Sequence, residues 1–128
     1  MSDPAHPPPV GLLLSRDLIF TSKVTGTAAA LGHRVVVVGD PARASALIAA
    51  GPPAVVFVDL AAGDLVAAPA LRRFQAEAAA GTPFVAFGSH VDVQALADAA
   101  AAGCDPVMPR SRFTAELPAL IRRYFPET

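Results

Sequence analysis

Asp59 is the side chain in this sequence best placed to do chemistry. It directly follows the apolar run at 54–58 (AVVFV). Open α/β sheets bind their ligands at the carboxyl ends of buried strands, and a carboxylate at this position would lie there. Two interpretations fit: Asp59 is a polar stop that accepts hydrogen bonds from loop amides, or it contacts a ligand.

Polar residues also follow the other apolar runs of the sequence. If the runs are parallel strands, these residues share one edge of the sheet with Asp59. The candidates for a site at this edge are Ser15, Arg16, Asp17, Gly88, Ser89 and Arg110, followed by the less informative His90 and Ser111.

Several kinds of active site are missing from the sequence. The turn at 14–17 has no glycine, so it holds neither a dinucleotide-binding fingerprint nor a phosphate loop. No Gly-x-Ser-x-Gly motif occurs, and the three histidines lack metal-ligand spacing. The single cysteine, Cys104, excludes an internal disulfide and a multi-cysteine zinc site. We therefore predict no enzymatic activity, no cofactor and no resident metal; the weak metal candidates are Asp17 and Asp59.

Composition indicates one globular domain. The chain has 128 residues, of which 53% are hydrophobic and 16% charged, with 10 basic and 11 acidic residues. Such a chain can bury one core, and its balanced charge offers no basic patch for nucleic acid or anionic lipid. No apolar stretch approaches the roughly 18 residues that span a bilayer, and no signal peptide is evident. These features predict a cytoplasmic protein.

The apolar runs alternate with stretches of helical spacing. The runs are continuous rather than alternating, which is typical of strands buried on both faces of a parallel sheet. Asp40-Pro41, Asp92 and Thr114 are candidate starts of helices, and Pro118 should lie in the first turn of the last helix or kink it. The predicted strands are at 10–14, 34–38, 54–58, 84–87 and 106–109. The pattern is β-α repeated five times, an open α/β sheet with helices on both faces.

The first nine residues, MSDPAHPPP, contain four prolines and no apolar periodicity. We predict a disordered, proline-rich leader over residues 1–9 and one domain over 10–126, with no second domain after it. A polyproline ligand for a partner is an alternative interpretation of the leader.

Four segments together resemble the receiver domain of two-component response regulators: 10–14, the run that ends in Asp59, 83–89, and Gly103-Cys104-Asp105 before a short strand. The resemblance covers residues 10–125. It implies a flavodoxin-like (βα)5 three-layer sandwich with its parallel strands in the order 2-1-3-4-5. As a domain alone, the chain resembles the single-domain regulators. The resemblance also implies that Asp59 is the position of the phosphoryl acceptor.

The sequence departs from the receiver pattern at most of its other chemical positions. The two acids that hold magnesium in the family fall on Ser15 and Arg16, and only Asp17, one place later, is acidic. The family's hydroxyl residue falls on Gly88, with Ser89 beside it, and its lysine falls on Arg110. The proline after that lysine and the switch aromatic fall on Ser111 and Val107.

These departures predict a degenerate receiver, or pseudo-receiver. We expect Arg16, with or without Arg110, to pair with Asp59 in place of the metal ion. The module would then act by binding proteins through the face of the fourth helix, fifth strand and fifth helix, or by forming a homodimer. Two alternatives stay open: a phospho-acceptor that uses Asp59 and Mg²⁺, and a flavodoxin-like domain that binds a small ligand or anion through Arg16, Ser89 and Arg110.

Overall fold

The computed structural model describes residues 8–126, so most of the predicted leader at 1–9 lies outside the described residues. Five parallel strands form one sheet in the order β2-β1-β3-β4-β5, as predicted. The elements, in chain order, are β1 (Gly11–Leu14), α1 (Leu18–Ala30), β2 (Val35–Val38), α2 (Pro41–Ala50), β3 (Val56–Asp59), the 3₁₀ segment η1 (Leu60–Val66), α3 (Ala68–Glu77), β4 (Phe84–Gly88), α4 (Val93–Ala101), β5 (Val107–Pro109) and α5 (Arg110–Tyr124).

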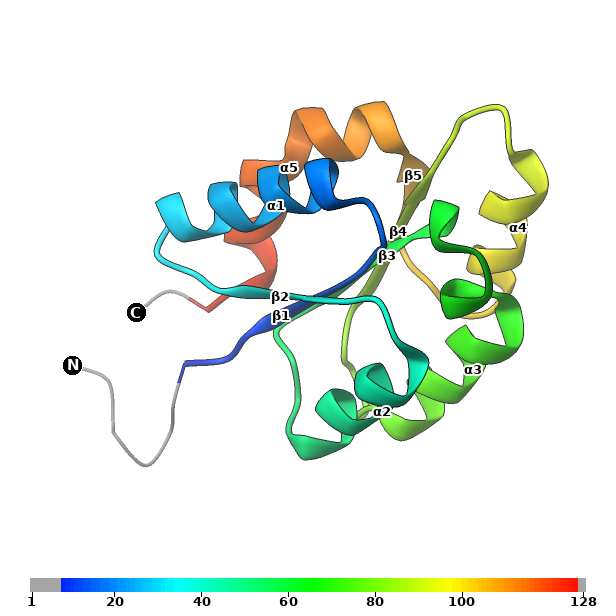
Figure 1. Cartoon of the computed structure of the whole chain (residues 1–128), viewed down its shortest axis with the longest axis horizontal. Helices are drawn as coiled ribbons and strands as arrows, with labels where there is room; N and C mark the ends of the chain where they lie inside the picture. The colour runs from blue at the N-terminus through cyan, green and yellow to red at the C-terminus, as the bar shows by residue number, and fades with distance from the viewer. Residues whose placement is uncertain (1–7, 127–128) are drawn as a thin grey trace.

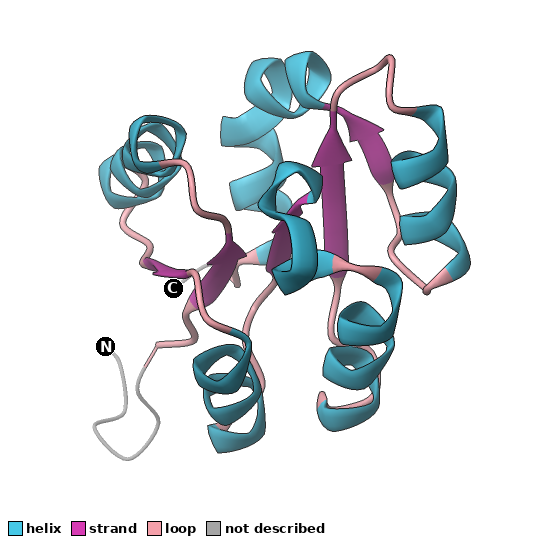
Figure 2. Ribbon diagram, turned by 45° about the vertical axis from the view of Figure 1, so that its right-hand side comes forward, coloured by secondary structure: helices cyan, strands magenta, loops and turns pink. Residues whose placement is uncertain are grey.

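The sheet is the middle of three layers. Helices α1 and α5 cover one face and α2, α3 and α4 cover the other (Figure 1), and the strand arrows all point toward the same edge (Figure 2). Successive residues of a strand point to opposite faces, so Leu12 and Leu14 pack on one side and Leu13 on the other. Both faces are buried, and this explains why the strands are continuous apolar runs.

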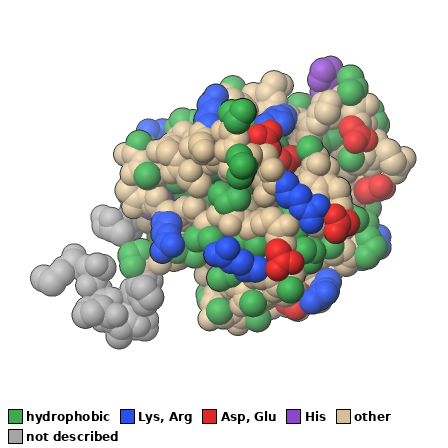
Figure 3. Space-filling view, in the orientation of Figure 1, with side chains coloured by type: hydrophobic (Ala, Val, Ile, Leu, Met, Phe, Trp, Pro, Cys, Tyr) green, Lys and Arg blue, Asp and Glu red, His purple; other side chains and the backbone are tan. Residues whose placement is uncertain are grey.

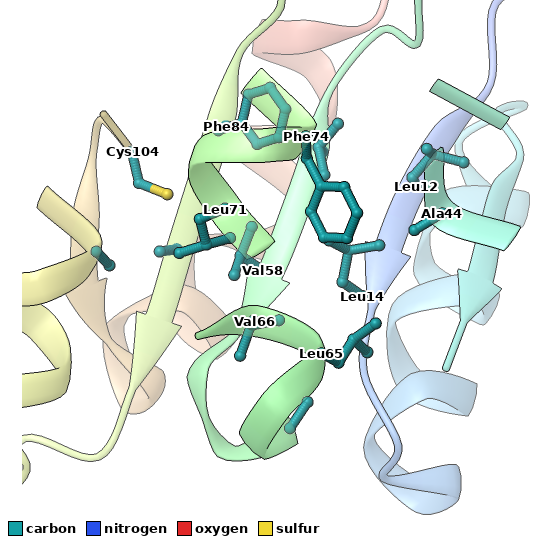
Figure 4. Close-up of a cluster of buried hydrophobic side chains, with 14 of the residues drawn as sticks. Leu12, Leu14, Ala44, Val58, Leu65, Val66, Leu71, Phe74, Phe84 and Cys104 are labelled. Atoms are coloured by element: carbon teal, nitrogen blue, oxygen red, sulfur yellow. The ribbon is translucent and has the colours of Figure 1, made fainter. Parts of the chain in front are cut away.

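The cluster under α2, α3 and α4 is built from aliphatic side chains and two phenylalanines, Phe74 and Phe84 (Figure 4). Cys104 lies in this cluster, and its burial raises the pKa of the thiol to about 11. It is a small core residue and not a reactive thiol. The cluster under α1 and α5 is aromatic, with stacked rings of Phe87 and Phe113 at its centre.

Three of the helices begin at aspartates that accept hydrogen bonds from the first turn. Asp17 accepts from the amide of Phe20 at 3.0 Å and caps α1. Asp40 and Asp92 cap α2 and α4 in the same way, at 3.2 and 3.1 Å. Each satisfies an amide that has no partner within its helix, so these helix starts could be located from sequence.

The start of the last helix differs from the prediction. Helix α5 begins at Arg110, directly after β5, with no side-chain cap, and Thr114 lies inside it and donates its hydroxyl to the carbonyl of Arg110 at 3.0 Å. Thr114 is therefore not a cap, and Pro118 lies well inside the helix rather than in its first turn. The buried residues Phe113 and Leu117 hold this stretch helical against the sheet despite the proline. No helix among residues 8–126 is long and apolar enough to cross a membrane.

Candidate functional site

The carboxyl ends of β3, β4 and β5 surround a pocket of about 270 Å³. Four of the predicted site residues line it: Asp59, Gly88, Ser89 and Arg110. The pocket is also lined by Ala61, His90, Pro109 and Ser111. Ala61 and Pro109 carry no chemical group that would draw attention in the sequence; their only signal is that they adjoin the ends of buried strands.

Asp59 is only 2% exposed, and both of its carboxylate oxygens accept hydrogen bonds. The Ser15 hydroxyl donates to Oδ2 at 2.6 Å, and the Ala61 amide donates to Oδ1 at 3.0 Å. The second bond caps η1, so Asp59 is in part the polar stop that its position allows. Ser15 is itself buried and holds the end of β1 against the end of β3.

The predicted pair between Arg16 and Asp59 is wrong. Arg16 donates to Oδ1 of Asp64 at 2.7 Å and to the carbonyls of Gly39 and Ala62, both at 3.1 Å. Its guanidinium side chain is 44% exposed, so it keeps part of its hydration. Pairing with buried Asp59 would cost that hydration, whereas acceptors on the loops are available without it. Arg16 therefore ties the loop after β1 to the loops after β2 and β3.

Arg110 does not neutralise Asp59 either. Its Nη2 donates to Oδ2 of Asp17 at 3.0 Å, and its guanidinium lies 4.0 Å from the ring centre of Phe20. Asp17 thus joins the start of α1 to the start of α5 and makes no metal pair with Asp59. The contacts expected for a bound anion, Arg16 and Arg110, are both committed to acids of the chain itself.

Two neighbours lower the pKa of the Asp17 carboxyl. The Phe20 amide, and after it the Arg110 guanidinium, hold the pKa of Asp17 below its ordinary value of 3.8. A carboxyl whose pKa is lowered on folding stabilises the fold above its unfolded pKa, and that contribution is lost as the pH falls through the lowered value. In Arg110→Met the pKa of Asp17 should rise but stay below 3.8, because the Phe20 amide remains.

The measurement for this prediction is an NMR pH titration of the Asp17 side-chain carbonyl carbon. Arg112→Met is the matched control, because Arg112 is an exposed arginine of the same helix that pairs with Glu116. An unchanged titration of Asp17 in Arg110→Met would show that the ion pair does not form in solution.

The residues around Asp59 do not fit a magnesium ion. Magnesium takes hard oxygens in near-octahedral geometry, usually with one or two carboxylates. Here Ser15 supplies a hydroxyl that already donates to Asp59, and Arg16 and Asp17 point to other partners. Within residues 8–126, no three histidine, cysteine or acidic side chains gather as metal ligands would.

Ser15→Ala should destabilise the protein because it removes a donor from a buried carboxylate. Hydrogen bonds to charged groups contribute roughly 1.5–3 kcal/mol, so we expect a loss of unfolding free energy in that range. Urea denaturation measures it, with Ser22→Ala as control; the Ser22 hydroxyl is exposed and bonds only to the Leu18 carbonyl within its own helix. A loss of less than about 0.5 kcal/mol, the level of an ordinary surface change, would mean that Asp59 does not depend on Ser15.

The sequence matches no protein family model and no curated protein sequence. Its fold does match solved structures. A response regulator from Thermotoga maritima is 17% identical, with a TM-score of 0.74 over 91% of this chain and 97% of that one. The receiver domain of a sensor histidine kinase from Pseudomonas aeruginosa, described with a magnesium ion coordinated in its active-site cleft, is 19% identical, with a TM-score of 0.77 over 91% and 97%. A response regulator from Hahella chejuensis is 14% identical, with a TM-score of 0.76 over 91% and 94%.

At these identities the likeness establishes the fold. The chain has the flavodoxin-like fold of response regulator receiver domains, with the strand order that the sequence resemblance implies. Asp59 closes the third strand of that fold at the edge where the pocket lies.

Proposed function

We propose that this chain is a receiver-like signalling module of a two-component or phosphorelay system that works in the cytoplasm without phosphorylation. It acts by binding other proteins and is not an enzyme. The observation that carries the proposal is the state of Asp59: its carboxylate is held by the Ser15 hydroxyl and the Ala61 amide, and within the described residues it belongs to no cluster of metal-ligating side chains.

Phosphoryl transfer to a carboxylate needs a carboxylate oxygen that can attack. It also needs a positive charge beside the transferred group to neutralise the negative charge on the phosphoryl oxygens. A divalent ion normally supplies that charge. Ser15 and Arg16 provide no ligand set for such an ion, and the cationic side chains nearby are paired with Asp64 and Asp17. Asp59 therefore has a structural role, as the cap of the segment after β3, and lacks the neighbours that a phosphoryl acceptor needs.

The proposed interaction face is made of α4, β5 and α5. Three of the six exposed residues of α4 are alanines, Ala97, Ala100 and Ala101, and their small side chains let a partner backbone approach closely. Arg122 and Arg123 are exposed on α5 and give the face a basic rim. On the side of the molecule in Figure 3, basic and acidic side chains are interspersed, which favours a protein partner or a second copy over nucleic acid.

The test is treatment of the full chain with acetyl phosphate and magnesium chloride, followed by intact-mass measurement. We expect no phosphorylated species at levels that a working receiver domain reaches under the same conditions. Stoichiometric modification of the protein that disappears in Asp59→Ala would overturn the proposal and establish the phospho-acceptor alternative.

A further inference from the structure

The carboxylate of Asp59 is a buried charge without a cationic partner. The side chain is 2% exposed, and among residues 8–126 its polar contacts are one hydroxyl and one amide, both uncharged. Buried charges in proteins are ordinarily paired or bind a cation, because desolvation of an uncompensated charge is expensive. Two hydrogen bonds leave unused lone pairs on the two oxygens, and Asp59 lines an open pocket.

The rest of the pocket favours a small cation with an apolar stem. The hydroxyls of Ser89 and Ser111 lie in the lining and can both accept hydrogen bonds, while Ala61 and Pro109 provide apolar walls. Among the described residues, Arg110 is the one arginine or lysine in the lining, and Asp17 balances its charge at 3.0 Å. The net uncompensated charge of the pocket is therefore the negative charge of Asp59.

We propose that this pocket binds a primary alkylammonium group, the chemical group at the end of a lysine side chain. An ammonium has three N–H donors, and three residues of the pocket offer acceptors: the carboxylate of Asp59 and the hydroxyls of Ser89 and Ser111. A guanidinium binds best in a bidentate manner to two free oxygens, and each Asp59 oxygen already has a partner. A magnesium ion would need further carboxylates or loss of its water shell.

The inference deepens the proposed function, because a lysine of a partner protein could dock here. The inference rests on the proposed function in one respect: both require that Asp59 is not phosphorylated. Modification of Asp59 by acetyl phosphate would overturn the function, whereas failure of amines to bind an unmodified Asp59 would overturn this inference alone.

The experiment is an NMR titration of the full chain with n-butylammonium chloride at constant ionic strength. We expect saturable shifts at the amides of Ala61, Ser89 and Ser111, with a dissociation constant in the millimolar range. Asp59→Asn keeps the size of the side chain and one acceptor oxygen for the Ala61 amide, but its NH2 group cannot accept from the Ser15 hydroxyl. Because the charge is removed, binding should weaken at least about tenfold, since charge-assisted bonds are roughly twice as strong as neutral ones. Asp105→Asn replaces an exposed acid that precedes β5, whereas the pocket lies at the carboxyl end of that strand, and it should leave binding unchanged.

A second ligand distinguishes a lysine of a protein from a free amine. Nα-acetyl-lysine methylamide carries the same ammonium on a peptide backbone. The exposed Val91 follows His90 of the pocket lining and is 74% exposed, so it can contact such a backbone. Tighter binding of the lysine derivative, with the gain lost in Val91→Ser, indicates a protein lysine; equal binding of the two ligands indicates a free amine.

Three results would overturn the proposal. The first is that neither ligand gives saturable shifts at the pocket. The second is that n-pentanol, which has an apolar stem but no charge, binds as tightly as n-butylammonium. The third is that Asp59→Asn binds the amine as tightly as the unaltered protein does.

Discussion

The double replacement Ser15→Asp/Arg16→Asp should make the stability of the protein depend on magnesium. The Ser15 hydroxyl lies 2.6 Å from the Asp59 carboxylate, so an aspartate at residue 15 places a second negative charge beside a buried one. Two like charges about 4 Å apart repel by about 4 kcal/mol at an effective dielectric constant of 20. Without a divalent ion we expect a loss of unfolding free energy of about that size.

Magnesium chloride at millimolar concentration should restore much of this loss, because a ligand that binds only the folded state stabilises it. The measurement is the thermal midpoint with and without magnesium. The unaltered protein should show no specific shift, and neither should the neutral pair Ser15→Asn/Arg16→Gln. Arg16→Asp also removes the bonds that tie the loops to Asp64 and Ala62, so both double variants share that part of the destabilisation. If magnesium chloride stabilised the unaltered protein and sodium chloride at equal ionic strength did not, the unaltered site would bind magnesium. That result would contradict the view that Ser15 and Arg16 leave the site without metal ligands.

The strands could be predicted closely because burial on both faces leaves a strong local signal. The run expected at 10–14 is β1 at Gly11–Leu14, and the run expected at 84–87 is β4 at Phe84–Gly88. Each strand must be apolar on both sides, so its ends coincide with the first polar or turn residue. The sheet order does not follow from such local patterns, and it came from the likeness of the whole chain to receiver domains.

The start of α5 could not be located in the same way. The sequence offers a cap at Thr114, but the helix starts four residues earlier at Arg110, directly from β5 and without a capping side chain. Packing of Phe113 and Leu117 on the sheet requires helix from that point. Tertiary packing thus overrides a local capping preference, as it does for most helices in globular proteins.

The ion-pair partners of the charged residues at the sheet edge could not be predicted from the sequence either. Adjacency of strand ends correctly brings Asp59, Ser89 and Arg110 to one pocket. The acid with which an arginine pairs depends on the reach of the side chain and on the cost of its desolvation. Neither can be predicted from the order of residue types alone. Arg16 bonds to the 3₁₀ segment after β3, an element that the sequence pattern does not predict.

Phe113→Ala should be among the most destabilising single changes in the protein. The Phe113 ring is fully buried under α5 and stacks on Phe87 with ring centres 4.0 Å apart. It also contacts Phe57 edge to face at 5.2 Å and lies 6.0 Å from Phe20, so it joins α1, β3, β4 and α5. Removal of a buried phenylalanine ring typically costs 3–5 kcal/mol, about the lower end of the stability of a whole domain.

Urea denaturation of Phe113→Ala, Phe113→Leu and Val91→Ala separates this packing from other effects. Phe113→Leu keeps most of the buried volume and should lose much less than the alanine variant, while Val91→Ala changes an exposed side chain and should stay within about 0.5 kcal/mol. The pocket depends on the same cluster, because Phe87 directly precedes Gly88 and Phe20 carries the Arg110 guanidinium on its ring. In Phe113→Leu the loss of stability should therefore come with shifted amide resonances at Ser89 and Ser111. Unchanged resonances there would show that the aromatic layer supports the fold without positioning the site.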